Sequence, residues 1–131
     1  MGISGGLLRV WCYRALGRFF TWQMAIRDDH ELITSGPYSI VRHPSYAAQL
    51  IMLAGNALVI FGPGSYFTES RLGRLLPWRT LATFEVVYLA IICATLVNRT
   101  GKEDDVLKQE FGSQWETWAE RTPYKLFPFV Y

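Results

Sequence analysis

Two long apolar runs, at residues 46–61 and 81–97, limit most strongly what this chain can fold into. The first run has no charged side chain, and the second has one, Glu85. Each run is slightly shorter than the ~20 residues that cross a bilayer core, so each needs flanking residues or neighbouring helices. The alternative is a pair of buried helices in a water-soluble protein. Only 18% of the residues are charged, against about a quarter in an average soluble domain, so too little polar sequence remains to cover such a pair. Two membrane-spanning helices are therefore expected.

The rest of the chain is arranged around these two runs as one all-α domain, residues 1–131. We expect a polytopic membrane helix bundle in which a helical hairpin is flanked by a loop and an amphipathic helix, and which forms the C-terminal part of a larger bundle. The expected segments are a helix over 1–26, a loop over 27–45, the spans over 46–61 and 81–97, and a cytosolic tail over 98–131.

The two flanking segments have distinct side-chain patterns. In the first helix Arg14 and Arg18 share one face and Arg9 points roughly the opposite way, which suits a helix packed against others better than one that faces lipid. In the tail, apolar residues recur at helical spacing and predict an amphipathic helix that Gly112 interrupts. These residues are Leu107, Phe111, Trp115 and Trp118.

A hairpin of two spans places the loop before it and the tail after it on the same side of the membrane. Arg42 and His43 can then meet Arg99 and the acidic run of residues 103–105. Near the spans, the Lys and Arg residues of these flanks outnumber those of the connector, which favours a cytosolic location for both flanks. The predicted site is therefore a cluster of charges at the cytosolic edge of the membrane.

Each of these features also has an ordinary structural interpretation. A single histidine is usually structural, acidic residues are favoured near helix N-termini, and an arginine after an apolar run is most often a membrane anchor. The net charge of +2 is too small and too mixed in sign to indicate nucleic-acid binding. Cys12 and Cys93 lie far apart without metal-ligand spacing, so they are expected to be buried free thiols, and no metal site is predicted.

The order of the motifs favours a functional interpretation. SGPYSIVRHPSY at residues 35–46 precedes the apolar hairpin, and R-T-x-x-E-D at 99–104, Phe111-Gly112 and the tail PYKLFPFVY follow it. This arrangement resembles the isoprenylcysteine carboxyl methyltransferase family, integral membrane enzymes that use S-adenosyl-L-methionine. The resemblance runs from about Gln23 to the C-terminus. R-H-P-x-Y alone is less specific, because related membrane methyltransferases and some membrane reductases have similar stretches.

The resemblance implies a role for each matching position. Arg99 would be the catalytic residue that binds the substrate carboxylate, and Arg42 and Asp104 are further candidates. Asp104 stands where the family usually has a second glutamate, and only the backbone of Glu31 is expected to matter. The implied S-adenosyl-L-methionine site consists of Gln23, His30, Glu31, Leu32, Ile33, Tyr38, His43, Pro44, Ser45, Tyr46 and Glu103.

The chemistry of methyl transfer to a prenylcysteine carboxylate suits these residue types. With a pKa of about 3.5, this carboxylate is ionised at neutral pH and needs no general base. The protein must orient it, remove water from it and balance its charge. Arg99 can hold it through bidentate hydrogen bonds, and Glu103 can hold the cofactor's ammonium group.

The expected activity is methyl esterification of prenylated (CaaX) protein C-termini in the endoplasmic reticulum membrane, by a multi-pass protein whose site faces the cytosol. Its partners would be farnesylated or geranylgeranylated proteins and the bilayer, and not nucleic acid. Three alternatives remain. A phospholipid N-methyltransferase would show strong pH dependence and tolerate loss of Arg99. An NADPH-dependent sterol reductase would need a larger set of basic residues to bind the 2′-phosphate of NADPH, and the acidic run 103–105 argues against it. A non-catalytic homologue is the third, since the family has upstream helices that this chain lacks.

Overall fold

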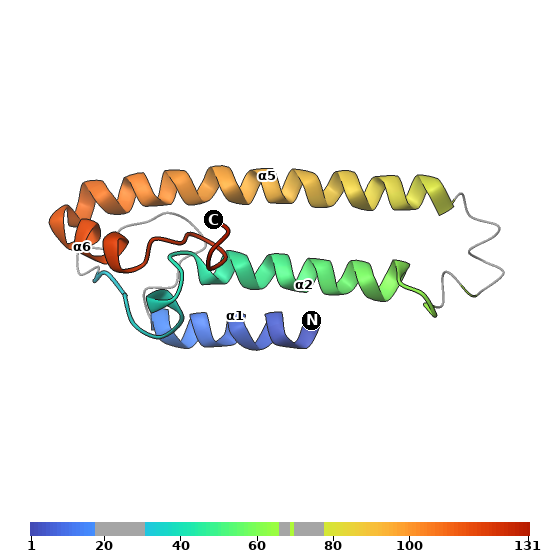
Figure 1. Ribbon diagram of the computed structural model, residues 1–131, viewed down its shortest axis with the longest axis horizontal. Coiled ribbons are helices and arrows are strands. Elements are labelled where there is room, and N and C mark those ends of the chain that lie inside the picture. Colours follow the sequence, from blue (N-terminus) through green and yellow to red (C-terminus); the bar gives the residue numbers. More distant parts are fainter. Residues whose placement is uncertain (18–30, 66–68, 70–77) are drawn as a thin grey trace.

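The structure is a computed structural model that describes residues 1–17, 31–65, 69 and 78–131. Within these ranges all regular structure is helical, which confirms the all-α class for this part of the chain (Figure 1). The elements are α1 (Gly2–Leu16), the short 3-10 helix η2 (Gly36–Ser39), α2 (Pro44–Phe61), α5 (Trp78–Phe111) and α6 (Ser113–Arg121).

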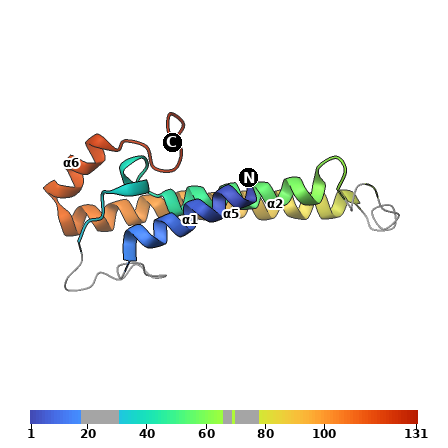
Figure 2. The same ribbon diagram turned by 90° about the horizontal axis from the view of Figure 1, so that it is seen from below.

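Three of the helices lie side by side along the long axis of the molecule. Figure 1 shows α2 between α1 and α5, with α2 antiparallel to both. At the end where α2 begins, α5 continues past it and the chain turns back through α6. Figure 2 shows that α6 and the C-terminal segment lie to one side of the three long helices. The loop before α2, the end of α5 and the C-terminal segment therefore meet at one end of the bundle.

The two longest helices are long and apolar enough to cross a membrane, and little of their surface is covered. Only 22% of the apolar window of α2 and 6% of that of α5 is buried within the structure. An uncovered apolar surface of this kind marks a region that lipid or protein must cover. The large exposed side chains on α5 include Leu81, Phe84, Val86, Val87, Tyr88 and Ile91.

Helix α5 corrects two expectations. It is one continuous helix of 34 residues, so the helix of the second apolar run extends past residue 97, and Arg99, Glu103 and Asp104 lie in that same helix instead of a separate tail. The change from apolar to polar side chains leaves helical spacing intact, and the backbone first leaves it at Gly112, where φ is 50°. Cys93, expected to be buried, is exposed on α5, whereas Cys12 is buried, and both are free.

Helix α1 also differs from the prediction. One helix was expected over residues 1–26, but α1 ends at Leu16, because Gly17 adopts φ 52° and leaves the helical backbone. Residues 18–26 of that prediction lie outside the described residues. Helix α2 begins at Pro44, two residues earlier than expected, since proline lacks a backbone N–H and suits the first turn of a helix.

Glycines allow α1 to pack closely on α2. A Cβ atom built on Gly5 would lie 2.8 Å from the backbone oxygen of Ala48 and 2.7 Å from Cγ of Met52. A Cβ atom on Gly55 would lie 2.6 Å from the backbone nitrogen of Gly2. Small residues at such contacts let helix backbones approach closely, which is a common way for helices to associate in membranes.

A small core joins α1 to the loop and to α6. Its buried side chains are Cys12, Tyr38 and Trp118, and Leu32, Ile33 and Trp115 pack against it. The indole nitrogen Nε1 of Trp118 donates a hydrogen bond of 3.0 Å to the backbone oxygen of Tyr38. This core holds the loop in place ahead of α2.

We expect Gly5→Ala and Gly6→Ala to have opposite effects on stability. The new Cβ at Gly5 meets backbone atoms of α2, so overpacking should lower the free energy of unfolding by about 1–3 kcal/mol. Nothing lies within 4 Å of a Cβ at Gly6, so alanine should raise it by up to about 1 kcal/mol through helix propensity. Unfolding in detergent micelles measures both. Equal effects of the two variants would contradict the packing.

Candidate active site

The backbone of the loop is fixed by the C-terminal segment. The amide of Arg42 donates to the carbonyl oxygen of Tyr124 at 2.9 Å, and the amide of His43 donates to that of Lys125 at 2.8 Å. Immediately afterwards Pro44 begins α2. His43 is thus held by backbone hydrogen bonds on one side and by a helix start on the other.

The side chain of His43 lies between two carboxylates of α5. Its Nε2 is 2.9 Å from Oδ1 of Asp104, and its Nδ1 is 3.4 Å from Oε2 of Glu103. His43 is only 6% exposed, and Asp104 is equally buried. These contacts join segments that are 61 positions apart in the sequence.

Asp104 has two further cationic partners. Its Oδ2 lies 3.4 Å from Nη2 of Arg42 and 3.4 Å from Nζ of Lys125. The Arg42 guanidinium also lies 5.7 Å from the ring centroid of Trp115, close enough for a cation–π interaction. Asp104 therefore connects the loop, α5 and the C-terminal segment. A buried carboxylate requires such compensation, because an unpaired charge is costly in a low-dielectric interior.

Glu103 organises the other half of the cluster. Its Oε1 accepts hydrogen bonds from the hydroxyl of Tyr46 and, at 3.0 Å, from Nε of Arg99. The Arg99 guanidinium lies over the Tyr46 ring, 5.8 Å from its centroid. The Arg99 side chain is 39% exposed, whereas that of Glu103 is 21% exposed. Arg99 is thus oriented from one side and accessible from another.

The charges of this cluster do not cancel. Three permanent cations, Arg42, Arg99 and Lys125, face two carboxylates, Glu103 and Asp104. Burial by itself would lower the pKa of His43, but its hydrogen bonds with Asp104 and Glu103 raise that pKa above its ordinary value. The cluster is therefore positive overall, and an anion is the ligand that its charge favours.

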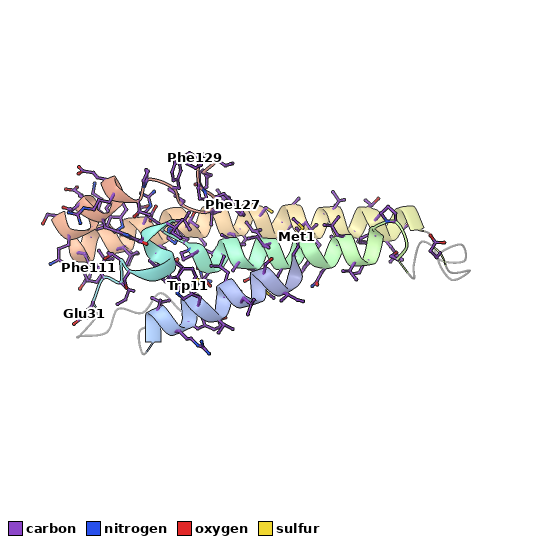
Figure 3. All side chains as sticks on the ribbon, turned by 60° about the horizontal axis from the view of Figure 1, so that its bottom comes forward. Met1, Trp11, Glu31, Phe111, Phe127 and Phe129 are labelled. Carbon is purple, nitrogen blue, oxygen red and sulfur yellow. The ribbon has the colours of Figure 1, made fainter. Side chains whose placement is uncertain are left out.

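The structure brings together six of the residues predicted for the site: Arg42, His43, Tyr46, Arg99, Glu103 and Asp104. Pro44 and Ser45 form the start of α2 beside them. Leu32, Ile33 and Tyr38 pack in the core next to the cluster. Glu31 is exposed at this end of the molecule, where polar side chains gather in Figure 3. Gln23 and His30 lie outside the described residues.

Sequence analysis missed the contribution of the C-terminal segment. Lys125 pairs with Asp104, and the carbonyl oxygens of Tyr124 and Lys125 hold the loop. Trp115 was predicted only as part of an amphipathic stripe, yet it lies beside Arg42. A lysine between apolar residues in the tail was the available signal for the first of these contacts.

The helix start considered for the acidic residues 103–105 is not present, because all three lie within α5, and only Asp105 is exposed to solvent. Asp105 is exposed, whereas Glu103 and Asp104 are at least partly covered and lie deep within α5. Neighbouring positions on a helix point about 100° apart. The two carboxylates can therefore contact different ring nitrogens of His43 and also pair with different cations.

Comparisons with known proteins identify the family of the chain. Residues 1–72, more than half of the chain, match the model of the isoprenylcysteine carboxyl methyltransferase (ICMT) family. Protein-S-isoprenylcysteine O-methyltransferase B of Arabidopsis thaliana is 31% identical over 99% of this chain and 57% of its own length. A probable protein-S-isoprenylcysteine O-methyltransferase of Oryza sativa subsp. indica is 29% identical over 99% of this chain and 59% of its own length.

The fold thus defines a class of protein: it is helical, it has two candidate membrane spans, and a charged cluster lies at the end where α2 begins. The chain belongs to the isoprenylcysteine carboxyl methyltransferase family. It spans somewhat more than half the length of the methyltransferases that it matches. Delta(14)-sterol reductase TM7SF2 of Mus musculus is also similar, with 32% identity over 77% of this chain but only 20% of the reductase. No solved structure matches the chain.

The raised pKa of His43 predicts a pH-dependent contribution to stability. A group whose pKa is higher in the folded state stabilises the fold fully below its unfolded pKa of about 6.5. That contribution is lost as the pH rises through the folded value. The midpoint of thermal unfolding should therefore fall more between about pH 6 and about pH 9 in the wild type than in His43→Gln. Identical pH profiles of the two proteins would show that His43 is not charged in the fold.

Proposed function

We propose that this chain forms the catalytic part of an S-adenosyl-L-methionine-dependent protein-S-isoprenylcysteine O-methyltransferase, which esterifies the C-terminal prenylcysteine carboxylate of prenylated (CaaX) proteins. The observation that carries this proposal is the Arg99–Glu103 pair, held against Tyr46 and His43 at the end of two apolar helices. A prenyl chain favours an apolar surface and its carboxylate a cationic group, and both are adjacent here.

Arg99 is the residue best placed to receive the carboxylate. Its Nε is tied to Glu103 and its guanidinium is supported by the Tyr46 ring, so its orientation is restricted. A pre-oriented guanidinium binds a carboxylate with less loss of entropy than a mobile lysine does. Because Arg99 shares its charge with Glu103, it can orient the carboxylate without fully neutralising the attacking oxygen.

The residues around Arg42 fit the cofactor. Arg42 Nε and Trp115 Nε1 are buried donors without a hydrogen-bond partner among the described residues. Buried donors in this state favour a ligand rich in acceptors, such as the carboxylate and ribose of S-adenosyl-L-methionine. When bound, the cofactor would supply an electrophilic methyl group on a sulfonium, which a carboxylate can accept without a proton transfer and with a neutral thioether as the leaving group. Glu103 and His43 would hold its polar groups.

The dimensions of α5 are consistent with a site at the membrane edge. Residues 78–97 rise about 30 Å, which is about the thickness of a bilayer core. Arg99 follows directly, so it would lie at the boundary, with the rest of α5, α6 and the C-terminal segment beyond it. With the larger number of Lys and Arg residues in these flanks, this supports a multi-pass membrane protein whose site faces the cytosol. The endoplasmic reticulum is proposed as its membrane from the family resemblance alone.

A sterol reductase is the second candidate, because the similarity to Delta(14)-sterol reductase TM7SF2 covers 77% of the chain. The two candidates differ in the product that they form. Membranes that contain the chain are incubated with methyl-labelled S-adenosyl-L-methionine and a farnesylated cysteine analogue. Base-labile methyl ester would support the methyltransferase. Its absence, together with NADPH-dependent reduction of a sterol double bond, would support the reductase.

Arg99→Ala should impair the use of the prenyl substrate more than that of the cofactor. Loss of a charge-assisted hydrogen bond of about 1.5–3 kcal/mol predicts an increase of roughly 10- to 100-fold in the KM for the farnesylated cysteine. The KM for S-adenosyl-L-methionine should change much less. Lys102→Ala, which alters an exposed cation on the same helix, is the control. An unchanged substrate KM in Arg99→Ala would remove Arg99 from carboxylate binding.

A further inference from the structure

A second polar group lies outside the charge cluster, between α1 and α2. Nη1 of Arg9 donates a hydrogen bond of 2.6 Å to Oε1 of Gln49, and Nε of Arg9 donates to the hydroxyl of Tyr13. The guanidinium also lies 5.4 Å from the centroid of the Tyr13 ring. All three side chains are partly buried. They form a small polar group on helices that are otherwise largely apolar.

Among the residues that the structure describes, no acid compensates the charge of Arg9. Among the described residues, the buried or partly buried arginines are Arg9, Arg42 and Arg99. Arg42 pairs with Asp104 and Arg99 pairs with Glu103, whereas the partners of Arg9 are a neutral phenol and a neutral amide. A partly buried cation without a counterion is costly, and this cost would be relieved by a bound anion.

The position of Arg9 is fixed by the close packing of α1 on α2. Gly5 and Arg9 are four residues apart and so share a face of α1, and Gly5 lies against Ala48 and Met52. Arg9 is one turn further along, towards the start of α2, where it reaches Gln49. The contact that holds α1 in place therefore also sets the depth of the guanidinium.

This depth is close to the candidate active site. Gln49 is three residues after Tyr46 on α2, so the two side chains are less than one helical turn apart along the axis. Arg9 approaches Gln49 from α1, and Arg99 approaches Tyr46 from α5. Two guanidinium groups thus flank the part of α2 where an amphiphile lying along the apolar helices would place its polar head.

We infer that Arg9, Tyr13 and Gln49 form a second oxyanion-binding site, which takes the carboxylate or phosphate head of an amphiphile. The guanidinium offers a planar set of donors that matches either oxyanion, and the amide nitrogen of Gln49 adds donors of its own. The anion has two sources, the carboxylate of the prenylcysteine substrate and the phosphate of a membrane phospholipid. Only the first rests on the proposed function.

Thermal stabilisation of the full chain in neutral detergent micelles tests this inference. The ligands are two matched pairs: farnesylcysteine carboxylate with its methyl ester, and phosphatidic acid with diacylglycerol. Each pair keeps the apolar part and removes the charge. In Arg9→Gln, the apparent affinity for the anionic member of at least one pair should fall by about tenfold, the loss expected for one charge-assisted hydrogen bond. Arg14→Gln, an exposed arginine of the same helix, should bind both as the wild type does.

The outcomes separate the sources. An Arg9-dependent loss for farnesylcysteine carboxylate alone assigns the site to the substrate, and a loss for phosphatidic acid alone assigns it to a phospholipid. A loss for both means that either oxyanion is accepted. Equal anion binding by Arg9→Gln and Arg14→Gln would overturn the inference and leave Arg9 a link between helices.

A second test uses only the wild-type protein, so it does not require that Arg9→Gln folds. It measures the modification of arginine side chains by phenylglyoxal. Mass spectrometry should show that the anionic member of a pair slows modification of Arg9 and that the neutral member does not. Equal rates with both members of each pair would also overturn the inference. Because neither measurement requires turnover, anion binding at Arg9 without methyl ester formation would contradict the proposed function alone.

Discussion

The placement of His43 between Glu103 and Asp104 is the interaction on which the rest of the site depends. It connects a loop held by the C-terminal segment to a long apolar helix, and it does so in a buried position. Without the imidazole, the charges of Glu103 and Asp104 would be less compensated, and of the ion pairs described between the loop and α5 only that of Arg42 with Asp104 would remain. The same contacts turn Glu103 towards Tyr46 and Arg99, so the fold and the site share one set of charges.

The continuous helix α5 gives this site its rigidity. Arg99 and Glu103 are one turn apart on a helix that extends from the apolar part of the molecule into its polar end. Side chains on a regular helix keep their spacing better than side chains on a loop, which suits a site that works by orienting reactants. Arg9 on α1 extends the cationic lining along α2, so the two helices that flank α2 each bring a guanidinium to it.

Much of this arrangement could be predicted from the sequence, because its main signals are local. The apolar runs predicted α2 and α5, and a hairpin between them required residues 42–43 and 99–104 to lie on the same side. The end of α1 at Leu16 and the continuation of α5 past residue 97 could not be predicted, since both depend on whether tertiary contacts and a glycine backbone favour helix at that point. The contacts of Lys125 with Asp104 and of Tyr124 with the loop depend on the path of the C-terminal segment, which no periodicity reveals.

The most direct test of the account is a double-mutant cycle between His43 and Asp104, measured by unfolding in mixed micelles at about pH 6, where the imidazole is charged. His43→Gln, Asp104→Asn and the double variant are compared with the wild type. Because the two side chains are in direct contact, we expect a coupling free energy of at least about 1 kcal/mol, with the double variant less destabilised than the sum of the single ones. Additivity within about 0.5 kcal/mol would mean that the loop and α5 are not joined through this pair.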